Sequence, residues 1–114
     1  MPTHETRIVE REDLPRVYRE AKELASPTFT WNDLGDEVLI VTVGADYSTA
    51  TLMKDDTFYN LAVSTSDELR EIQVSGDTSL WPEGHILPRE LGLEVLLRAP
   101  DIDSLMHEYT WEEQ

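Results

Sequence analysis

Residues 36–74 read DEVLIVTVGADYSTATLMKDDTFYNLAVSTSDELREIQV, and this stretch decides the fold. It contains four apolar segments, VLIVTV, YSTATLM, FYNLAV and LREIQV, which are rich in the β-branched and aromatic residues that favour strands. The breaks between them are short and polar, as at residues 54–57 and 64–67. Because breaks of this length cannot hold a parallel crossover, the stretch predicts a four-stranded antiparallel meander.

Two amphipathic helices are predicted, one before the meander in the sequence and one after it. Before it, apolar residues recur at helical spacing on one face: Leu14, Val17, Tyr18, Ala21, Leu24 and Ala25. Asp13 suits the N-cap of this helix, Pro15 fits its first turn, and Pro27 ends it. After the meander, Pro88 opens a second helix over residues 89–99. Apolar residues cover so much of its circumference that we expect it to be buried on more than one side.

The remaining segments predict one further strand and a long connection. Residues 109–111 (YTW) show strand-like alternation and predict a final strand that joins the sheet. Residues 28–31 (TFTW) suit either a brief strand or an ordered loop, and residues 7–10 suit a short edge strand. Residues 76–88 have two glycines and two prolines without a regular period, which predicts an irregular loop. Together these patterns predict one α+β domain over residues 1–114, with an antiparallel meander sheet of four to six strands packed with two helices.

Acidic residues dominate the chain, which has 24 Asp and Glu against 9 Lys and Arg and a formal net charge of −15 at pH 7. Residues 1–26 contain five basic and six acidic side chains and sum to −1, which leaves −14 for residues 27–114. A surface of this sign repels nucleic acid and anionic lipid, and it attracts basic proteins. The alternative reading is that acidity only keeps the protein in solution.

Neither a membrane nor a nucleic-acid partner is expected. The opening segment MPTHETRIVEREDLP lacks the apolar core of a secretory signal, and no run reaches the roughly 18 apolar residues that a membrane helix needs. The sheet region has only Lys54 and Arg70 as basic residues, whereas a phosphate-binding track needs several. We therefore expect a cytoplasmic protein. The lack of cysteine also suits a reducing compartment.

The polar residues form no catalytic or metal-binding motif. His4, His85 and His107 lie far apart in the sequence and show no ligand spacing. Residues 101–104 (DIDS) begin like a calcium-binding loop, but Met106 occupies the sixth position, where that loop needs glycine. Without cysteine, thiolate ligands and cysteine nucleophiles are excluded. We therefore expect no enzymatic activity, no catalytic residues, no bound metal and no cofactor.

Protein binding remains, and seven residues are candidates for it. Trp81 is an aromatic residue of the type enriched at the centres of interfaces, although it could instead pack under the predicted loop into the core. The others are carboxylates at predicted turns and in the loop, which would form a broad acidic rim: Asp55, Asp56, Asp67, Glu68, Asp77 and Glu83. A solvated surface without a partner is the alternative reading of this rim.

Several segments together resemble a bacterial family of immunity proteins for polymorphic toxins, of the actinobacterial type often paired with nucleic-acid deaminases. The similarity spans roughly residues 37–112 and includes VLIVTVGADYSTATL, a tryptophan in a loop rich in proline and glycine, LPRELGLEVLLRAP and a terminal YTWEE. The matching positions are Gly44, Asp46, Trp81, Pro88 and Trp111. Residues 101–107 lack the glycine and proline that the family often has before its last strand.

The resemblance implies an immunity protein that binds a cognate toxin and occludes its active cleft. A toxin that acts on nucleic acid is expected to be basic, and the acidic surface of this chain would steer it into contact. The resemblance brings no catalytic residues with it. The alternative is an adaptor or regulatory domain that binds another basic protein. The oligomeric state stays open.

Overall fold

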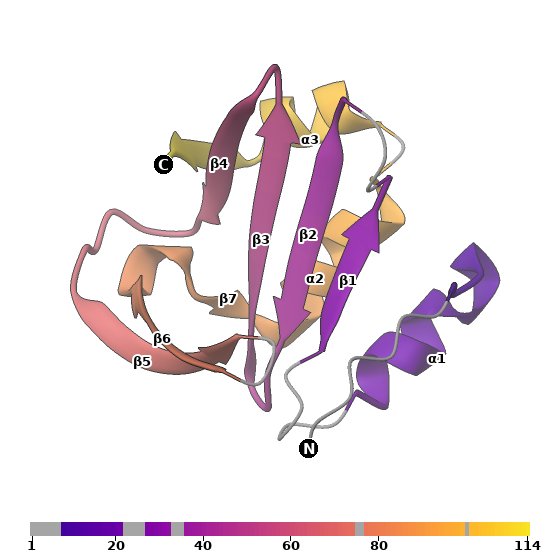
Figure 1. Ribbon diagram of the computed structural model, residues 1–114, viewed down its shortest axis with the longest axis horizontal. Helices are drawn as coiled ribbons and strands as arrows, with labels where there is room; N and C mark the ends of the chain where they lie inside the picture. Colours follow the sequence, from indigo (N-terminus) through magenta and orange to yellow (C-terminus); the bar gives the residue numbers. More distant parts are fainter. Residues whose placement is uncertain (1–7, 22–26, 33–35, 75–76, 100) are drawn as a thin grey trace.

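A six-stranded antiparallel sheet with helices against one face forms the body of the protein, so the α+β class predicted from the sequence is confirmed (Figure 1). The computed structural model describes residues 8–21, 27–32, 36–74, 77–99 and 101–114. The strands of the sheet are β1 (Thr28–Trp31), β2 (Val38–Val43), β3 (Tyr47–Lys54), β4 (Thr57–Ala62), β7 (Leu87–Pro88) and β8 (Thr110–Glu113). They follow the order β1-β2-β3-β4-β8, and β7 pairs with the start of β3.

The predicted meander forms for β2, β3 and β4. The register pairs Leu39 with Leu52 and Val41 with Ala50 on one face of the sheet. Because side chains alternate along a strand, the residues between them point to the opposite face. The segment TFTW, for which a strand and a loop were both open, is strand β1 and pairs with β2.

The last segment of the predicted meander, LREIQV, is a strand but does not join the sheet. It forms β5 (Leu69–Val74), which pairs with β6 (Asp77–Pro82) in a separate two-stranded sheet. The place beside β4 is taken by β8, which is the predicted final strand. The prediction of an irregular loop over residues 76–88 is wrong for β6 and β7, and between these strands lies the 3₁₀ turn η3 (Glu83–His85).

Helix α1 (Leu14–Arg19) begins where the sequence predicts, after the 3₁₀ turn η1 (Arg11–Asp13). Asp13 occupies the N-cap position, but its side chain makes no capping hydrogen bond. Residues 22–26, the predicted second half of this helix, lie outside the described residues, as does Arg7 of the predicted edge strand. Residues 8–10 have no regular secondary structure, so the described part of that strand prediction is wrong.

Helix α2 (Arg89–Leu97) follows Pro88 as predicted, and a further helix, α3 (Ile102–Glu108), was not predicted. Asp101 is the N-cap of α3, and its carboxylate accepts a hydrogen bond from the backbone N–H of Ser104 at 3.2 Å. The DIDS segment that begins like a calcium-binding loop is therefore the start of a helix. The sequence predicted two helices, and the described residues contain three.

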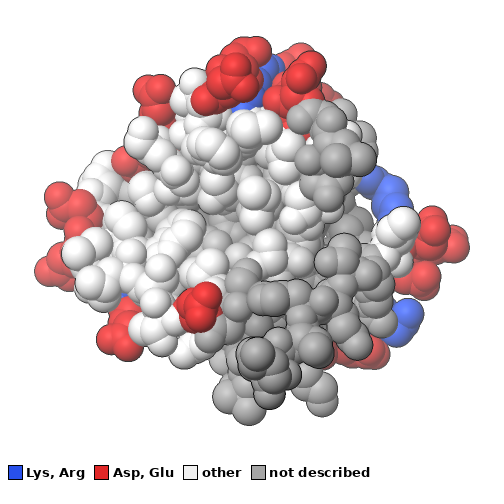
Figure 2. All heavy atoms as spheres, viewed as in Figure 1, with Lys and Arg blue, Asp and Glu red and all other residues white. Residues whose placement is uncertain are grey.

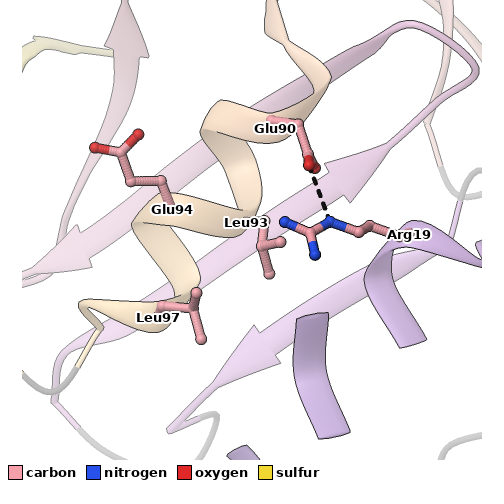
Figure 3. A pocket seen from close by; sticks show the side chains of 5 residues that line it. All are labelled: Arg19, Glu90, Leu93, Glu94 and Leu97. Carbon is pink, nitrogen blue, oxygen red and sulfur yellow. Dashed lines mark hydrogen bonds and ion pairs between the residues drawn. The ribbon is translucent and has the colours of Figure 1, made fainter. Parts of the chain in front are cut away.

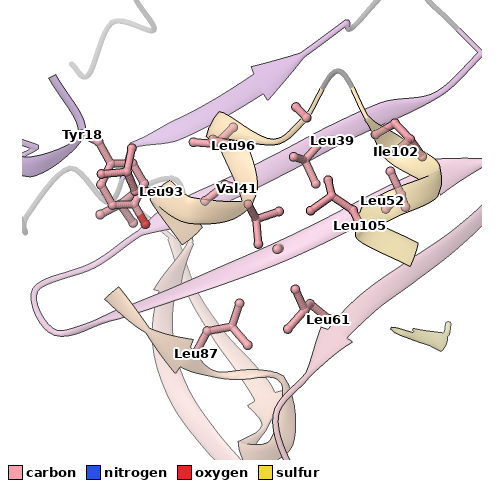
Figure 4. Close-up of a cluster of buried hydrophobic side chains, with 14 residues drawn as sticks. Tyr18, Leu39, Val41, Leu52, Leu61, Leu87, Leu93, Leu96, Ile102 and Leu105 are labelled. Atoms are coloured by element: carbon pink, nitrogen blue, oxygen red, sulfur yellow. The ribbon is translucent and has the colours of Figure 1, made fainter. Parts of the chain in front are cut away.

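The three helices bury apolar side chains against the same face of the sheet (Figure 4). The helices contribute Tyr18, Leu93, Val95, Leu96, Ile102 and Leu105 to this core. The strands contribute Leu39, Val41, Val43, Ala50, Leu52, Leu61 and Leu87. Helix α2 contacts β2, β3, β7 and α1, so it is buried on more than one side, as predicted.

One arginine ties α1, α2 and the β2–β3 turn together at the edge of the core. The Arg89 guanidinium donates hydrogen bonds to the carbonyl oxygens of Gly44 at 2.9 Å and Tyr18 at 3.2 Å. The buried Tyr18 hydroxyl donates to the carbonyl oxygen of Arg89 at 2.6 Å, and the guanidinium carbon lies 5.6 Å from the Tyr18 ring centre. Here α2 approaches the sheet so closely that a Cβ at Gly92 would collide with the Tyr18 hydroxyl and with Ser48.

We expect Gly92→Ala to lower the free energy of unfolding by about 1–3 kcal/mol, because it adds a methyl group to a filled core. In an exposed helix the same change would raise stability by up to about 1 kcal/mol, since alanine is the better helix former. Urea denaturation measures the difference. In Gly92→Ala/Tyr18→Phe the missing hydroxyl removes the closest of the collisions, so the loss should be smaller than the sum of the two single losses. Additive losses would contradict this packing.

Burial raises the pKa of Tyr18 to about 12, although the nearby Ser48 hydroxyl and Arg89 guanidinium lower it. An unfolded tyrosine ionises near pH 10, so between about pH 10 and pH 12 only the unfolded state releases this proton. The stabilisation is complete below about pH 10 and is lost as the pH rises through about 12, with a slope of at most about 1.4 kcal/mol per pH unit. Urea denaturation from about pH 9 to about pH 11 should show a shallower fall for Tyr18→Phe. Equal slopes would show that Tyr18 does not carry this effect.

Candidate partner-binding surface

The structure divides the seven predicted partner-binding residues into two groups. The first group lies on the β5–β6 hairpin or directly beside it: Asp67, Glu68, Asp77, Trp81 and Glu83. The second group, Asp55 and Asp56, forms the β3–β4 turn at the opposite end of β4 (Figure 1). A six-residue strand spans about 20 Å, so one small epitope cannot include both groups. The described residues from 67 to 83 are termed the hairpin surface below.

The two faces of the hairpin differ in burial. One face holds Ile72, which is 6% exposed, and Trp81, which is half-buried. The other face holds Leu69 and Leu80, which are 61% and 63% exposed. Glu71 is paired with Leu80 and lies on this exposed face as well. Trp81 is not among the described residues that pack on the main core, so its role as an anchor stays a prediction.

Sequence reasoning missed the two exposed leucines. A usable signal was present, because Ser75-Gly76 separates two strand-like runs and such a dipeptide predicts a turn. Ile72 and Val74 share one face of the resulting hairpin by their spacing, which places Leu69 on the other face.

Polar contacts hold the hairpin to the body at both of its ends. At one end the Tyr47 hydroxyl donates to the carbonyl oxygen of Gln73 at 2.6 Å and accepts from the N–H of Gln73 at 2.9 Å. At the other end the N–H of Gly84 donates to the carbonyl oxygen of Ser66 at 2.9 Å. The carbonyl oxygen of Gly84 accepts from the N–H of Val63 at 2.8 Å. A Cβ at Gly84 would collide with backbone oxygen atoms of the chain that leaves β4, so this close contact needs glycine.

The Asp55–Asp56 turn has a structural reason for its residues. Both adopt left-handed backbone conformations, with φ angles of 52° and 62°, as a two-residue hairpin turn requires, and aspartate tolerates this region. The adjacent Lys54 ammonium pairs with Asp103 at 2.9 Å and with Glu37 at 3.2 Å. These hydrogen bonds raise the pKa of Lys54, and Lys54 lowers the pKa of Asp103. Lys54 is therefore engaged within the protein.

Figure 2 shows the face of the sheet that the helices leave uncovered. Its described centre is largely uncharged, and most of the Asp and Glu side chains in view lie around the rim. The hairpin surface has five acidic residues, Asp67, Glu68, Glu71, Asp77 and Glu83, and one arginine, Arg70. Its formal charge is therefore five negative and one positive, or −4.

A shallow hollow between α1 and α2 is lined by Arg19, Glu90, Leu93, Glu94 and Leu97 (Figure 3). Its volume of about 180 Å³ is smaller than the roughly 300 Å³ at which sites for small molecules begin. The Arg19 guanidinium and the Glu90 carboxylate pair at 3.0 Å. Because these charged groups already bind each other, we assign the hollow to the packing of the two helices.

Other polar groups make contacts between elements of the body. The Ser104 hydroxyl accepts a hydrogen bond from Arg98 at 2.9 Å, and Arg98 also pairs with Glu108. The Nε2 atom of His85 lies 3.6 Å from the Glu112 carboxylate on β8. Among the described residues, no three His, Asp or Glu side chains are grouped so that they could hold a metal ion.

Comparison with known proteins identifies no relative, because no family model, curated protein or solved structure matches the chain. No helix in the described ranges is long and apolar enough to cross a membrane. The function must therefore be inferred from the chemistry of the sequence and from the geometry of the hairpin surface.

Tyr47→Phe should loosen the hairpin without unfolding the body. The change removes both hydrogen bonds to Gln73, so amide exchange at Gln73 should become at least about tenfold faster. The free energy of unfolding of the whole chain should fall by no more than about 2 kcal/mol. Hydrogen exchange followed by NMR measures the first effect, and Tyr59→Phe on β4 is the matched control. Unchanged exchange at Gln73 in Tyr47→Phe would mean that the hydroxyl does not hold the hairpin.

Proposed function

We propose that this protein is an immunity protein that binds a cognate bacterial toxin through its hairpin surface and keeps the toxin from its substrate. The proposed toxin is a basic enzyme that acts on nucleic acid, such as a deaminase. This class of toxin is supported by the resemblance in sequence. The choice of surface is supported by the geometry of the hairpin.

The observation that carries the proposal is the pair of exposed leucines set among carboxylates. Leu69 and Leu80 are each more than 60% exposed and lie on the same face of a hairpin that stands apart from the main sheet. Exposed apolar residues with a rim of polar ones are typical of protein interaction sites. Small-molecule sites are instead concave pockets. The leucines would form the centre of the contact, and the carboxylates would form its rim.

Charge favours a basic partner for this surface. The hairpin surface carries −4 within a chain of net charge −15. Complementary charge steers two proteins together and can raise the association rate constant to about 10⁸ M⁻¹s⁻¹ or more at low salt. An enzyme that binds nucleic acid uses basic residues to contact phosphate groups. An acidic protein can therefore compete with the substrate for the same cleft.

An adaptor or regulatory domain that binds another basic protein is the second candidate. The same exposed leucines and carboxylates would serve it equally well. The two functions differ in what the partner does when this chain is absent. An immunity protein has a partner that harms the cell, and an adaptor does not.

Expression of the protein encoded next to this gene tests the proposal, because immunity genes accompany their toxins. We expect that protein to stop growth of a bacterial host when it is expressed alone and to be tolerated when this chain is co-expressed. In the co-expression assay, Glu68→Gln/Glu71→Gln should protect less well than the unsubstituted chain. A neighbour that is harmless when expressed alone would contradict immunity and favour the adaptor.

Association kinetics provide the matched control for this test. Glu68→Gln/Glu71→Gln should lower the association rate constant for the toxin by about three- to tenfold at low salt, and the effect should shrink at high salt. Asp55→Asn/Asp56→Asn removes the same charge from the β3–β4 turn, and asparagine tolerates the left-handed backbone found there. This control should change the rate constant by less than about twofold. Equal effects of the two variants would mean that the hairpin is not the docking surface.

A further inference from the structure

At the outer edge of β5, the backbone groups of Leu69 and Glu71 pair with no strand of the described residues. Both the N–H and the carbonyl oxygen of Gln73 bind the Tyr47 hydroxyl, so they point away from β6. Backbone groups alternate between the two edges of an antiparallel strand. The N–H and carbonyl groups of Leu69 and Glu71 therefore also point away from β6. The carbonyl oxygen of Glu68 accepts from the N–H of Glu83 at 2.7 Å, toward β6, as the same alternation requires.

No strand among the described residues pairs with this outer edge. Strand β5 has β6 as its neighbour, and the hairpin forms a two-stranded sheet of its own. In Figure 1, β5 is the outermost element on its side of the molecule. Leu69, Arg70 and Glu71 are all exposed, so the edge is accessible beside Leu69 and Glu71.

Two of the other edges carry features that oppose pairing. Strand β8 ends with two like charges, Glu112 and Glu113, and charges on an edge strand oppose further pairing. The neighbouring charges of β5, Arg70 and Glu71, instead have opposite signs. The outer edge of β6 includes Pro82, which has no N–H to donate. Tyr47 covers the outer edge of β5 only at Gln73. The Leu69–Glu71 part of β5 is thus equipped for pairing with a strand from another chain.

We infer that the partner adds a strand to this edge of β5, in an extended segment that places a basic side chain beside Glu71 and an aliphatic one beside Leu69. This inference rests on the proposed function and specifies how the toxin docks. Main-chain hydrogen bonds to Leu69 and Glu71 would supply affinity, and the two side chains would supply specificity. The exposed Leu80 extends the apolar contact across the hairpin.

The charge of the hairpin selects this occupant over a second copy of the chain. Pairing two β5 strands edge to edge would bring together two surfaces that each carry −4. Like charges opposed across paired strands are destabilising. A segment with lysine or arginine beside Glu71 meets the opposite condition. The chain alone should therefore not dimerise by pairing its β5 strands. A dimer formed through β5 would overturn the inference.

The test uses the capped peptide acetyl-Lys-Thr-Val-Thr-Lys-Thr-Val-amide, which presents lysine and valine on one face of a strand. We expect it to bind the full chain, and we expect a version with glutamate in place of lysine not to bind. Two further peptides carry N-methyl groups, one on the lysine and valine amides and the other on the threonine amides. Strand addition predicts that one of them binds at least about tenfold more weakly than the parent while the other binds like the parent.

The identity of the weakened peptide also reports the strand direction. In an antiparallel pair, a residue whose backbone groups point toward the partner strand exchanges both hydrogen bonds with the residue directly opposite it. Antiparallel addition to Leu69 and Glu71 therefore weakens the peptide methylated at lysine and valine. Parallel addition weakens the other one. Equal binding by all three basic peptides, or no binding of the parent at about 1 mM, would overturn strand addition.

Hydrogen exchange and two variants separate backbone pairing from charge attraction. With the parent peptide bound, the amides of Leu69 and Glu71 should exchange at least about tenfold more slowly. Glu71→Pro removes the N–H and should bind the peptide at least about tenfold more weakly than Glu71→Gln, which removes only the charge. Peptide binding without protection of Leu69 and Glu71 would overturn strand addition and leave the proposed immunity function standing. A harmless neighbouring protein together with protected amides would contradict the immunity function and leave strand addition standing.

Discussion

The contact between Arg89 and Tyr18 ties α1 and α2 to each other and to the sheet. Arg89 binds carbonyl oxygens at the end of α1 and in the β2–β3 turn, while the Tyr18 ring fills the space between α1 and α2. A single ammonium group could not serve these acceptors together, because only the planar guanidinium presents several donors in a fixed geometry. Gly92 allows α2 to lie close enough for the contact to form.

Local patterns predicted most elements of the body but not all of their neighbours. The strands β2, β3 and β4 and the helix α2 each carry their own period and stop signals. Which strand lies beside β4 depends on contacts far along the chain, so β5 looked like the next strand although β8 takes that place. Helix α3 was missed because its seven residues are too few to show a helical period, and because its acidic cap resembles a metal-binding loop.

The candidate site was predictable in its charges but not in its apolar centre. Carboxylates at turns can be identified from sequence, because turns lie on the surface whatever surrounds them. The turn signal and the strand pattern place Leu69 and Ile72 on opposite faces of a hairpin, but which of these faces meets solvent depends on what packs against the hairpin. Ile72 is buried and Leu69 is exposed on the opposite face of the hairpin. The same uncertainty applies to Trp81, which lies on the less exposed face.

The separation of the hairpin from the main core has a consequence for how such a protein can evolve. Leu69, Glu71 and Leu80 lie outside the core cluster, and exposed substitutions of this kind usually change stability by less than about 0.5 kcal/mol. Mutations at these positions can therefore accumulate while the body continues to fold. A lineage could replace the residues that we propose to meet the partner one at a time, and related chains with the same body could come to recognise different partners.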